Sequence, residues 1–433
     1  MKRAAEGIFR HTLAAIDIHD ALERRLDRRG SLINAAGADI DLREFKEIVA
    51  IAFGKAAFSM AQALSAILAP DFTLQGIVVG PDAQRRALAG WTAFSGSHPL
   101  PTAESFEAGR AILDRLARCD EKSLVIFLIS GGGSSMVESA LDPDLKLDDF
   151  RALHSALVGC GAAIEEINVI RKHLSASKGG RLAAAAPRSL RLTYAISDVP
   201  QGHESALASG PTLPDPTTVA DADAIVAKHG LMAKFPPVVR EIFESGRLRE
   251  TPKHGDPVFS GNHFFRILGE HELLHAAHHS SEAAGFHCLV DQLTDGWPLE
   301  KAANHLLETL ENLRADNPGK RVALFAGGEL SSPVTGNGIG GRNSAFVLSC
   351  VPKIAGKKIA VLSAGTDGID GNSPAAGVVA DGETFERAKA AGVDPAKYLA
   401  ASDAYTFFAR LNDAIVTGPN GNILRDLRIF IAQ

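Results

Sequence analysis

A block of basic residues, which a chain that binds nucleic acid would need, is missing from this sequence. Its 433 residues include 45 Lys and Arg against 51 Asp and Glu, so the formal net charge is −6. The basic residues gather in no stretch that could follow a phosphate backbone. We therefore expect no nucleic-acid partner.

Long apolar runs are also missing. No stretch approaches the roughly 18 apolar residues that a membrane span requires. The first 22 residues are interrupted by charges and histidines, and they lack the compact apolar core of a signal peptide. We expect no membrane partner.

Cysteine is scarce, and the sequence lacks any fixed-period repeat or low-complexity tract. The four cysteines lie far apart, in none of the spacings typical of metal sites: Cys119, Cys160, Cys288 and Cys350. We interpret them as reduced, partly buried thiols, which predicts a cytoplasmic protein.

Short apolar runs alternating with longer helical patterns are what the sequence does contain. Those in the first half of the chain predict buried parallel strands at 47–54, 75–80, 123–130 and 190–197. A turn or a helix start follows each of the first three, which is typical of a doubly wound, Rossmann-like α/β sheet. Similar runs return at 286–292, 321–329, 357–365 and 413–419.

The length of the chain favours two domains. Hydrophobic residues make up 45% of it and charged residues 22%, so it can bury real cores. Residues 233–263 are richer in Pro, Gly and alternating charges, which places a boundary near residue 250. We predict an N-terminal α/β domain over 1–250 and a second α/β domain over 251–433.

A glycine-rich turn follows the apolar run that ends near residue 129. It consists of Ser130, Gly131, Gly132, Gly133, Ser134 and Ser135. Such a turn presents backbone N–H groups and hydroxyls at a helix start, which suits a phosphate or a carboxylate. A tight turn without a ligand is the alternative, but three successive glycines exceed what a turn needs.

Lys55 follows a second strand-ending glycine, Gly54, and lies where a helix should begin. A cation is unfavourable there because the helix dipole is already positive. A surface lysine pointing away is the ordinary explanation, and an anion bound at this helix start is the functional one. The segment is not a Walker A loop, since Val49 stands where that loop needs Gly.

A basic segment and an acidic residue come next along the chain. Residues 168–187 concentrate basic residues, of which Lys172 is a candidate phosphate ligand, although a basic helix face is more often simply solvated. Asp198 ends a predicted strand, where ligands and their metals bind in parallel sheets, and a long polar loop follows it.

A formal G-x-G-x-x-G motif occurs at Gly336, Gly338 and Gly341, which raises the possibility of a nicotinamide-dependent reductase. The polar segment before it carries Pro333, whereas the dinucleotide fingerprint needs a buried strand there. Arg342, directly after the motif, suits bidentate capture of a carboxylate or a phosphate.

Acidic and amide side chains stand near this arginine and at another predicted strand end. They are candidates for the vicinity of the substrate or a metal: Glu329, Asn343, Asp367 and Asp370. Two carboxylates could hold Mg²⁺, for which we favour Asp198 and Asp367, although Asp-Gly pairs are also ordinary turn formers. N–H-rich loops, a few cations and acidic strand ends are what phosphoryl transfer requires. The sequence shows neither the metal-binding histidine cluster of a hydrolase nor a G-x-S-x-G elbow.

These segments, taken in order, resemble the class II glycerate 2-kinases, whose C-terminal part is called the MOFRL domain. The resembling segments include "GKAA", "SHPLP", "LISGGGSS", "INVIRKHLSASKGGRLA", "SDVPQGHESALASGPTLPDPTT", "GGRN", "SAGTDGIDGNSPAAG" and "VTGPNGNILRDLRIFI". The resemblance extends from about residue 50 to the C-terminus. It implies an ATP- and Mg²⁺-dependent kinase for the 2-hydroxyl of D-glycerate, with two α/β domains and an active site in the cleft between them. Lys55 and Arg342 match the family's essential lysine and arginine.

Three segments depart from the family pattern: Gln201–His203, Ser344–Ala345 and Asn420–Arg425. These departures leave open a kinase for a related hydroxy acid, and a binding protein that has lost the chemistry. An NAD(P)H-dependent hydroxypyruvate reductase is a further alternative, since members of the family often carry that name. The sequence does not predict the oligomeric state.

Overall fold

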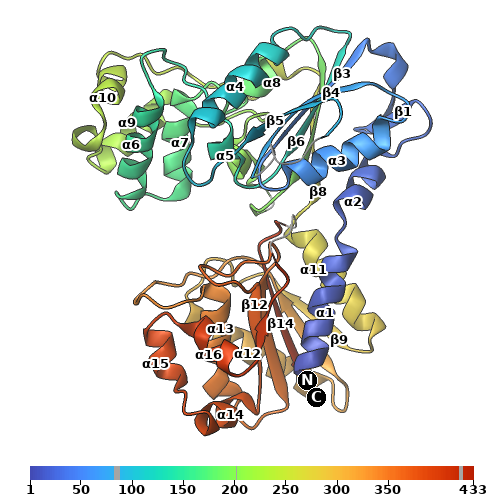
Figure 1. Cartoon of the computed structure of the whole chain (residues 1–433), viewed down its shortest axis with the longest axis vertical. Helices are drawn as coiled ribbons and strands as arrows, with labels where there is room; N and C mark the ends of the chain where they lie inside the picture. The colour runs from blue at the N-terminus through green and yellow to red at the C-terminus, as the bar shows by residue number, and fades with distance from the viewer. Residues whose placement is uncertain (82–87, 201, 419–422) are drawn as a thin grey trace. The chain divides into compact units, whose positions relative to one another are not determined.

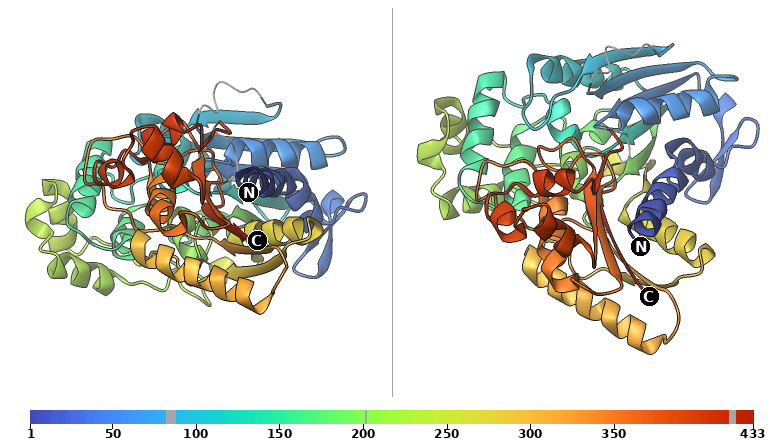
Figure 2. Two further views of the ribbon diagram at one scale, coloured as in Figure 1. Left: turned by 90° about the horizontal axis from the view of Figure 1, so that it is seen from below. Right: turned by 60° about the horizontal axis from the view of Figure 1, so that its bottom comes forward.

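The structure of the protein is a computed structural model that describes residues 1–81, 88–200, 202–418 and 423–433 (Figure 1). The chain forms two compact units. We call Ile18–Ile267 the amino-terminal unit, and Met1–Asp17 together with Leu268–Gln433 the carboxy-terminal unit. Both ends of the chain therefore lie in the carboxy-terminal unit (Figures 1 and 2).

The amino-terminal unit is built on a six-stranded sheet in the order β5-β4-β3-β6-β7-β8. Its strands are β3 (Glu47–Phe53), β4 (Leu74–Gly80), β5 (Trp91–Ser95), β6 (Ser123–Ile129), β7 (Leu190–Ile196) and β8 (Asn262–Leu268). The first five pair in parallel. Phe53 pairs with Ile129, which in turn pairs with Ala195, so the segments after β3, β6 and β7 emerge side by side at one edge.

Helices cover both faces of this sheet. They are α2 (Ile18–Leu26), α3 (Ala57–Leu68), α4 (Ala103–Leu116), α5 (Gly133–Met136) and α8 (Arg181–Ala184). Helix α4 shares an apolar core with one face, and α3 packs against β3 and β4. Because apolar residues fill both faces, the parallel strands read as continuous apolar runs.

Two smaller elements complete the amino-terminal unit. One is a hairpin of β1 (Leu32–Ala35) and β2 (Ala38–Asp41). The other is a helical layer with its own apolar core, formed by α6 (Leu147–Val158), α7 (Ile164–Leu174), α9 (Val219–Lys228) and α10 (Pro237–Glu244).

The carboxy-terminal unit contains a mixed sheet in the order β13-β12-β11-β14-β10-β9. Its strands are β9 (His287–Asp291), β10 (Val322–Ala326), β11 (Ile359–Gly365), β12 (Gly377–Asp381), β13 (Ala414–Ile415) and β14 (Asp426–Ala432). Strand β14 is antiparallel to both β10 and β11. The start of β14 therefore lies beside the ends of those two strands.

Helices surround this second sheet. They are α1 (Lys2–Ala15), α11 (Glu270–Ala283), α12 (Leu299–Asp316), α13 (Arg342–Ile354), α14 (Thr384–Ala390), α15 (Pro395–Ala400) and α16 (Ala404–Arg410). Helices α12 to α16 contribute to one apolar core with the sheet, and α1 and α11 pack against its strands outside that core. No described helix is long and apolar enough to cross a membrane. The four cysteines are all free thiols.

The expected α/β class, with a doubly wound N-terminal sheet and a second α/β region, is confirmed. The two compact units, however, are not divided near residue 250. Strand β8 adds to the edge of the first sheet beside β7, which keeps the chain in the amino-terminal unit to Ile267. Helix α1 packs against α11, β11, β12 and β14, so the first 17 residues belong to the carboxy-terminal unit.

Candidate active site

The turns after β3 and β6 are joined by hydrogen bonds at the edge of the first sheet. The backbone N–H of Lys55 donates to the carbonyl of Gly131 (2.9 Å), and that of Ala56 donates to Ser130 Oγ (2.9 Å). Gly54 lies in the left-handed region (φ +116°), and a Cβ there would clash with Ser130. The structure thus brings Lys55 and the glycine-rich turn together, as we expected.

Asp198 packs directly on this turn. A Cβ on Gly131 would collide with the Asp198 carboxylate, so only glycine allows this close approach. Gly132 adopts a left-handed conformation (φ +80°), from which α5 begins at Gly133. The carboxylate expected at the end of β7 therefore lies beside the glycine-rich turn.

Cations surround the same turn. A Cβ on Gly132 would lie 3.2 Å from Lys55 Cγ and 3.5 Å from His98 Cδ2, so both side chains lie over that glycine. Partial burial and the charges of Lys55 and Arg171 lower the pKa of His98, which keeps solvent access. Within the part of the chain that the structure describes, neither the Lys55 ammonium nor the Arg171 guanidinium forms a hydrogen bond or an ion pair. Unpaired cations gathered at one turn are suited to an anionic ligand.

His154 lies within the influence of the same positive charge. Burial and the charges of Arg171 and His98 lower its pKa. Its Nδ1 atom is buried without a hydrogen-bond partner among the described residues. A bound anion would relieve this accumulation of positive charge.

We expect the imidazole of His98 to report an anion bound at this turn. Its proton NMR titration should have a midpoint below the usual value of about 6.5, because partial burial and, after it, the nearby cations disfavour the charged ring. Inorganic phosphate or ATP would offset those cations and should raise the midpoint. Lys55→Met should raise it even without a ligand. A midpoint that responds to neither change would contradict an anion site here.

The serines of the turn have different surroundings. Ser134 Oγ lies 2.8 Å from Ser209 Oγ, and the Ser209 hydroxyl donates to Asn168 Oδ1 (3.1 Å). Ser209 and the preceding Ala208 both have positive φ, 62° and 49°. Such strained backbone persists only where its surroundings hold it, often at binding sites. The Ser135 hydroxyl donates to the carbonyl of Ser97 (2.8 Å) and so braces the turn.

A buried ion pair holds the segment that directly follows the glycine-rich turn and α5. Lys178 Nζ lies 2.6 Å from Glu138 Oε2, and both side chains are almost wholly buried. Burial lowers the pKa of Lys178, and the charge of Glu138 opposes that shift. The hydroxyl of Ser175 also donates to Glu138. This network fixes the segment that follows α5.

Lys178→Met should destabilise the protein by about 3–5 kcal/mol, because it leaves the Glu138 carboxylate buried and unpaired. Urea unfolding measures the change. The double variant with Glu138→Gln should recover part of the loss. Lys228→Met, which removes an exposed partner of Glu166, should have little effect. Equal losses in Lys178→Met and Lys228→Met would show that the buried pair is not special.

Lys172 is not brought to the glycine-rich turn as a free cation. It is buried and pairs with Asp215 at 3.1 Å. Thr217 and Thr251 donate to the same carboxylate (2.9 and 3.0 Å). Its ammonium therefore connects the segment after Ser209 to α7, and the phosphate contact that we expected of Lys172 stays a prediction.

Arg342 opens α13 in the carboxy-terminal unit and is held by two carboxylates. Its Nε lies 2.5 Å and its Nη2 3.2 Å from the two oxygens of Asp426, and Nη2 lies 2.9 Å from Glu329 Oε1. Burial opposes the charged guanidinium, but the hydrogen bond and charge of Asp426 outweigh it and raise the pKa of Arg342. The arginine is permanently charged, and its side chain remains 36% exposed.

Further charged groups lie at the ends of β10 and β11. Arg425, with a left-handed backbone (φ +70°), pairs with Asp295 (2.6 Å) and Glu270 (3.2 Å). The fully buried Arg428 donates to the carbonyl of Gly328 (3.2 Å). A Cβ on Gly365 would lie 3.1 Å from Asp367 Oδ1 and 3.6 Å from Asp426 Oδ1, so the structure brings Asp367 to the Arg342–Asp426 pair.

Asp370 and Asn343 serve the fold of this unit. The buried Asp370 carboxylate accepts from the backbone N–H groups of Gly341 (3.1 Å), Asn343 (2.9 Å) and Ser344 (2.9 Å). It therefore caps the first turn of α13. Burial raises the pKa of Asp370, and those donors oppose the shift. Asn343 is also buried and accepts from the hydroxyl of Ser363 (2.5 Å). Both residues therefore hold the start of α13, where Arg342 lies, and their place near a substrate or a metal stays a prediction.

The glycines of the G-x-G-x-x-G match are explained by packing. They lie between β10 and α13, and 15 residues separate the strand from the helix. A Cβ on Gly336 would clash with Ala401, and one on Gly338 would clash with Asp403. Gly338 N–H also donates to the carbonyl of Ala401 (3.1 Å). Helix α13 does begin directly after Gly341, but the motif lacks the buried strand that immediately precedes a dinucleotide fingerprint.

Only some residues of the three segments that depart from the family pattern lie in the described part of the chain. Gln201 and Asn420–Asn422 lie outside the described residues. Ser344 fits its place, since its Oγ accepts from Gly341 N–H (3.1 Å). Arg425 is the last residue of the third departing segment, and it forms the ion pairs with Asp295 and Glu270 described above.

Among the described residues, neither Asp198 nor Asp367 belongs to a cluster of three or more metal-type ligands. The one such group in this part of the chain is Asp17, His19 and Asp20, whose two carboxylates are exposed. Mg²⁺ commonly binds through one or two carboxylates, with waters and substrate phosphates completing its shell. Asp198, held against a turn lined by cations, fits that mode.

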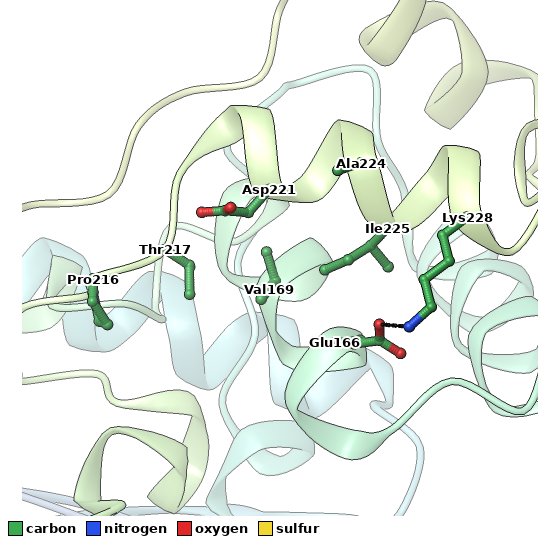
Figure 3. A pocket seen from close by; sticks show the side chains of 8 residues that line it. All are labelled: Glu166, Val169, Pro216, Thr217, Asp221, Ala224, Ile225 and Lys228. Atoms are coloured by element: carbon green, nitrogen blue, oxygen red, sulfur yellow. Dashed lines mark hydrogen bonds and ion pairs between the residues drawn. The ribbon is translucent and has the colours of Figure 1, made fainter.

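A separate hollow of about 480 Å³ lies between α7 and α9 (Figure 3). Its lining is Glu166, Val169, Pro216, Thr217, Asp221, Ala224, Ile225 and Lys228. The carboxylate of Glu166 is already paired with Lys228 across it (2.7 Å), as Figure 3 shows. None of the residues expected from the sequence lines this hollow, so we do not place the active site there.

Comparisons with known proteins agree with this picture. Residues 4–244 match the family described as a domain of unknown function, DUF4147, and residues 322–426 match the MOFRL family. A Thermotoga maritima protein named D-glycerate 2-kinase is 33% identical, covering 88% of this chain and 90% of that protein. The chain belongs to the glycerate 2-kinase family. Its fold is similar to the crystal structure of Thermotoga maritima glycerate kinase, with a TM-score of 0.86 at 30% identity, covering 100% of this chain and 99% of that one.

Relatives in this glycerate 2-kinase family carry two kinds of name. The glycerate 2-kinase of Pyrococcus horikoshii is 32% identical, covering 89% of this chain and 87% of that protein. An Agrobacterium vitis protein, 36% identical over 96% of this chain and 93% of its own length, is provisionally named a hydroxypyruvate reductase. Family membership therefore leaves the choice between kinase and reductase to the chemistry of the site.

Several residues that lie beside the candidate residues of each unit were not among those selected from the sequence. They are His98, Asn168, Arg171, Ser209 and Asp426. His98 belongs to the quoted segment "SHPLP", and Arg171 belongs to the basic stretch at residues 168–187, from which we selected only Lys172. Asp426 is the first residue of β14, and the apolar runs in the sequence did not lead us to predict a strand there.

Proposed function

We propose that the protein is an ATP-dependent kinase that transfers the γ-phosphoryl group to the 2-hydroxyl of D-glycerate, giving 2-phospho-D-glycerate. The observation that carries this proposal is the cation-lined turn, where the side chains of Lys55 and Arg171 form no ion pair among the described residues and N–H-rich backbone lies nearby. Such a turn suits a polyphosphate. Relatives named glycerate kinase, and the chain's membership of their family, support the choice of substrate.

The residues of the amino-terminal unit are proposed to hold the phosphates. The backbone of Gly131–Gly133 and the Ser134 hydroxyl would donate hydrogen bonds to them, and Lys55 and Arg171 would neutralise their charge. Asp198 would hold Mg²⁺, which neutralises the charge of the transferring group when bound. In the transfer itself the substrate hydroxyl oxygen forms a bond to the γ-phosphorus, the bond to ADP breaks, and the hydroxyl proton is released.

Arg342 is proposed to bind the carboxylate of glycerate or the transferring phosphoryl group. A guanidinium can meet two anionic oxygens at once. Asp426 and Glu329 already hold its plane, so the arginine is preorganised, and its exposed part leaves room for a ligand. Asp426 is thus a positioning residue in this proposal.

A hydroxypyruvate reductase is the second candidate, because relatives carry that name. The packing of Gly336 and Gly338 against residues 401–403 counts against it, since these glycines do not form a dinucleotide-binding turn. A reductase would need a nicotinamide site elsewhere in the chain.

One assay separates the candidates. Purified protein with ATP, Mg²⁺ and a panel of hydroxy acids should release ADP only when a hydroxy acid is present, with D-glycerate giving the largest kcat/KM. A four-carbon acid as the best substrate would replace glycerate and keep the kinase. Steady NADH oxidation with hydroxypyruvate would establish the reductase. If the protein neither releases ADP nor oxidises NADH, the remaining candidate is a binding protein without catalytic activity.

The unpaired cysteines support a reducing compartment, and we propose a cytoplasmic location. Fractionation of cells followed by immunodetection tests this directly. Recovery of the protein outside the cytoplasm would contradict it.

A further inference from the structure

Helix α11 carries an unusual concentration of histidine. Four of the chain's 15 histidines lie between residues 271 and 279 of this helix. Three of them, His271, His275 and His279, are spaced by four residues, so they lie one above another on the helix surface. None of these residues takes part in the proposed kinase chemistry.

The three rings form an exposed ladder. The centroids of His271 and His275 lie 6.3 Å apart with planes inclined by 20°, and those of His275 and His279 lie 6.4 Å apart at 11°. All three side chains are exposed. Among the described residues, His275 and His279 have no hydrogen-bond or ion-pair partner, and His271 Nδ1 has only Glu272 at 3.4 Å.

An ordinary solvated helix face would not be built this way. Histidine is a weaker helix former than Lys, Glu or Ala. Oppositely charged pairs four residues apart would stabilise the helix better. On the same helix, His278 has a carboxylate at that spacing, with Nδ1 3.4 Å from Glu282. A ladder of three parallel imidazoles offers instead a row of nitrogen ligands.

We propose that His271, His275 and His279 bind a divalent transition-metal ion of the Zn²⁺, Ni²⁺ and Cu²⁺ class. Two imidazoles four residues apart on one helix face can ligate one such ion. Metal–nitrogen bonds of about 2.0–2.1 Å require the two ring nitrogens to approach within roughly 3 Å, which small rotations of exposed side chains allow. His275 belongs to both possible pairs, and water completes the coordination.

Calorimetric titration of the untagged protein with Ni²⁺, Zn²⁺ and Cu²⁺ tests this site. One ion should bind per chain, with Cu²⁺ bound most tightly, as expected for imidazole ligands. Removing even an outer partner of a metal ligand costs about 10–100-fold in affinity. His275→Ala removes a ligand from both pairs, so its affinity should fall at least that far.

The other histidines of α11 provide matched variants. His271→Ala and His279→Ala each leave one pair intact and should lose much less affinity than His275→Ala. His278→Ala, on the same helix but outside the ladder, should bind as the parent does. The parent should also melt at a higher temperature with excess Ni²⁺, and His275→Ala should not. Equal binding by the parent and His275→Ala, or equal losses in His275→Ala and His278→Ala, would overturn the proposal.

Discussion

Lys55→Met should lower kcat/KM for ADP release with D-glycerate by about 10²–10³-fold, the usual cost of losing one preorganised charge partner. Methionine keeps most of the length of the side chain and removes its charge. Lys55 is exposed and unpaired among the described residues, so the melting temperature should stay nearly unchanged. Steady-state kinetics and a thermal melt on one preparation measure both effects.

Lys122→Met is the matched control for this prediction. Lys122 is equally exposed and directly precedes β6, at the opposite end of the strand that leads to the glycine-rich turn. Its loss should leave kinetics and melting unchanged. A fully active Lys55→Met enzyme would show that the cation at the turn serves another purpose, even if the protein is a glycerate kinase. Inactivity of the parent itself would instead refute the proposed function.

The fold could largely be predicted from the apolar runs, for a physical reason. Strands of a parallel sheet are buried on both faces, so β3, β4, β6 and β7 appear as continuous apolar segments with little alternation. Their parallel pairing then places Gly54, Gly131 and Asp198 at one edge of the sheet. Locating the end of each apolar run in the sequence was therefore enough to predict that these residues lie together.

The division of the chain could not be predicted in the same way. The Pro- and Gly-rich stretch near residue 250 has the composition of a linker, but β8 pairs beyond it with β7. Likewise, α1 has an apolar stripe, but the sequence does not indicate which of the two sheets that stripe packs against. Its buried residues include Ile8 and Phe9, and it packs in the carboxy-terminal unit.

The roles of individual charges depended on contacts between distant segments. Lys172 and Arg171 are neighbours in the sequence, yet Lys172 meets the buried Asp215 while Arg171 remains unpaired among the described residues. Asp367 and Asp370 share one loop, yet only Asp370 caps α13. Composition shows that such residues are present, and only the tertiary structure shows which ones are already neutralised.

Arg342→Lys should lower kcat by about a hundredfold, and kcat/KM with it, if the guanidinium stabilises charge that develops in the transition state. Lysine keeps a positive charge beside Asp426 but loses the planar, bidentate geometry. We therefore expect the melting temperature to change by only a few degrees. Measuring turnover and melting on the same variant separates this role from simple stabilisation of the loop.

Arg387→Lys is the matched control for that measurement. Like Arg342, Arg387 contacts both oxygens of one nearly buried carboxylate: its Nη1 lies 2.9 and 3.2 Å from the two oxygens of Asp413. The two arginine side chains are similarly exposed, at 39% for Arg387 and 36% for Arg342. Arg387 stands on α14, away from the ends of β10 and β11. Both lysine variants replace a guanidinium that contacts both carboxylate oxygens with a single ammonium, so they should melt at similar temperatures. Only Arg342→Lys should lose turnover, because only its guanidinium is proposed to face the reacting groups. If both variants remained fully active, the pairing of Arg342 with Asp426 would be structural, and the residue that binds the substrate would have to be sought elsewhere.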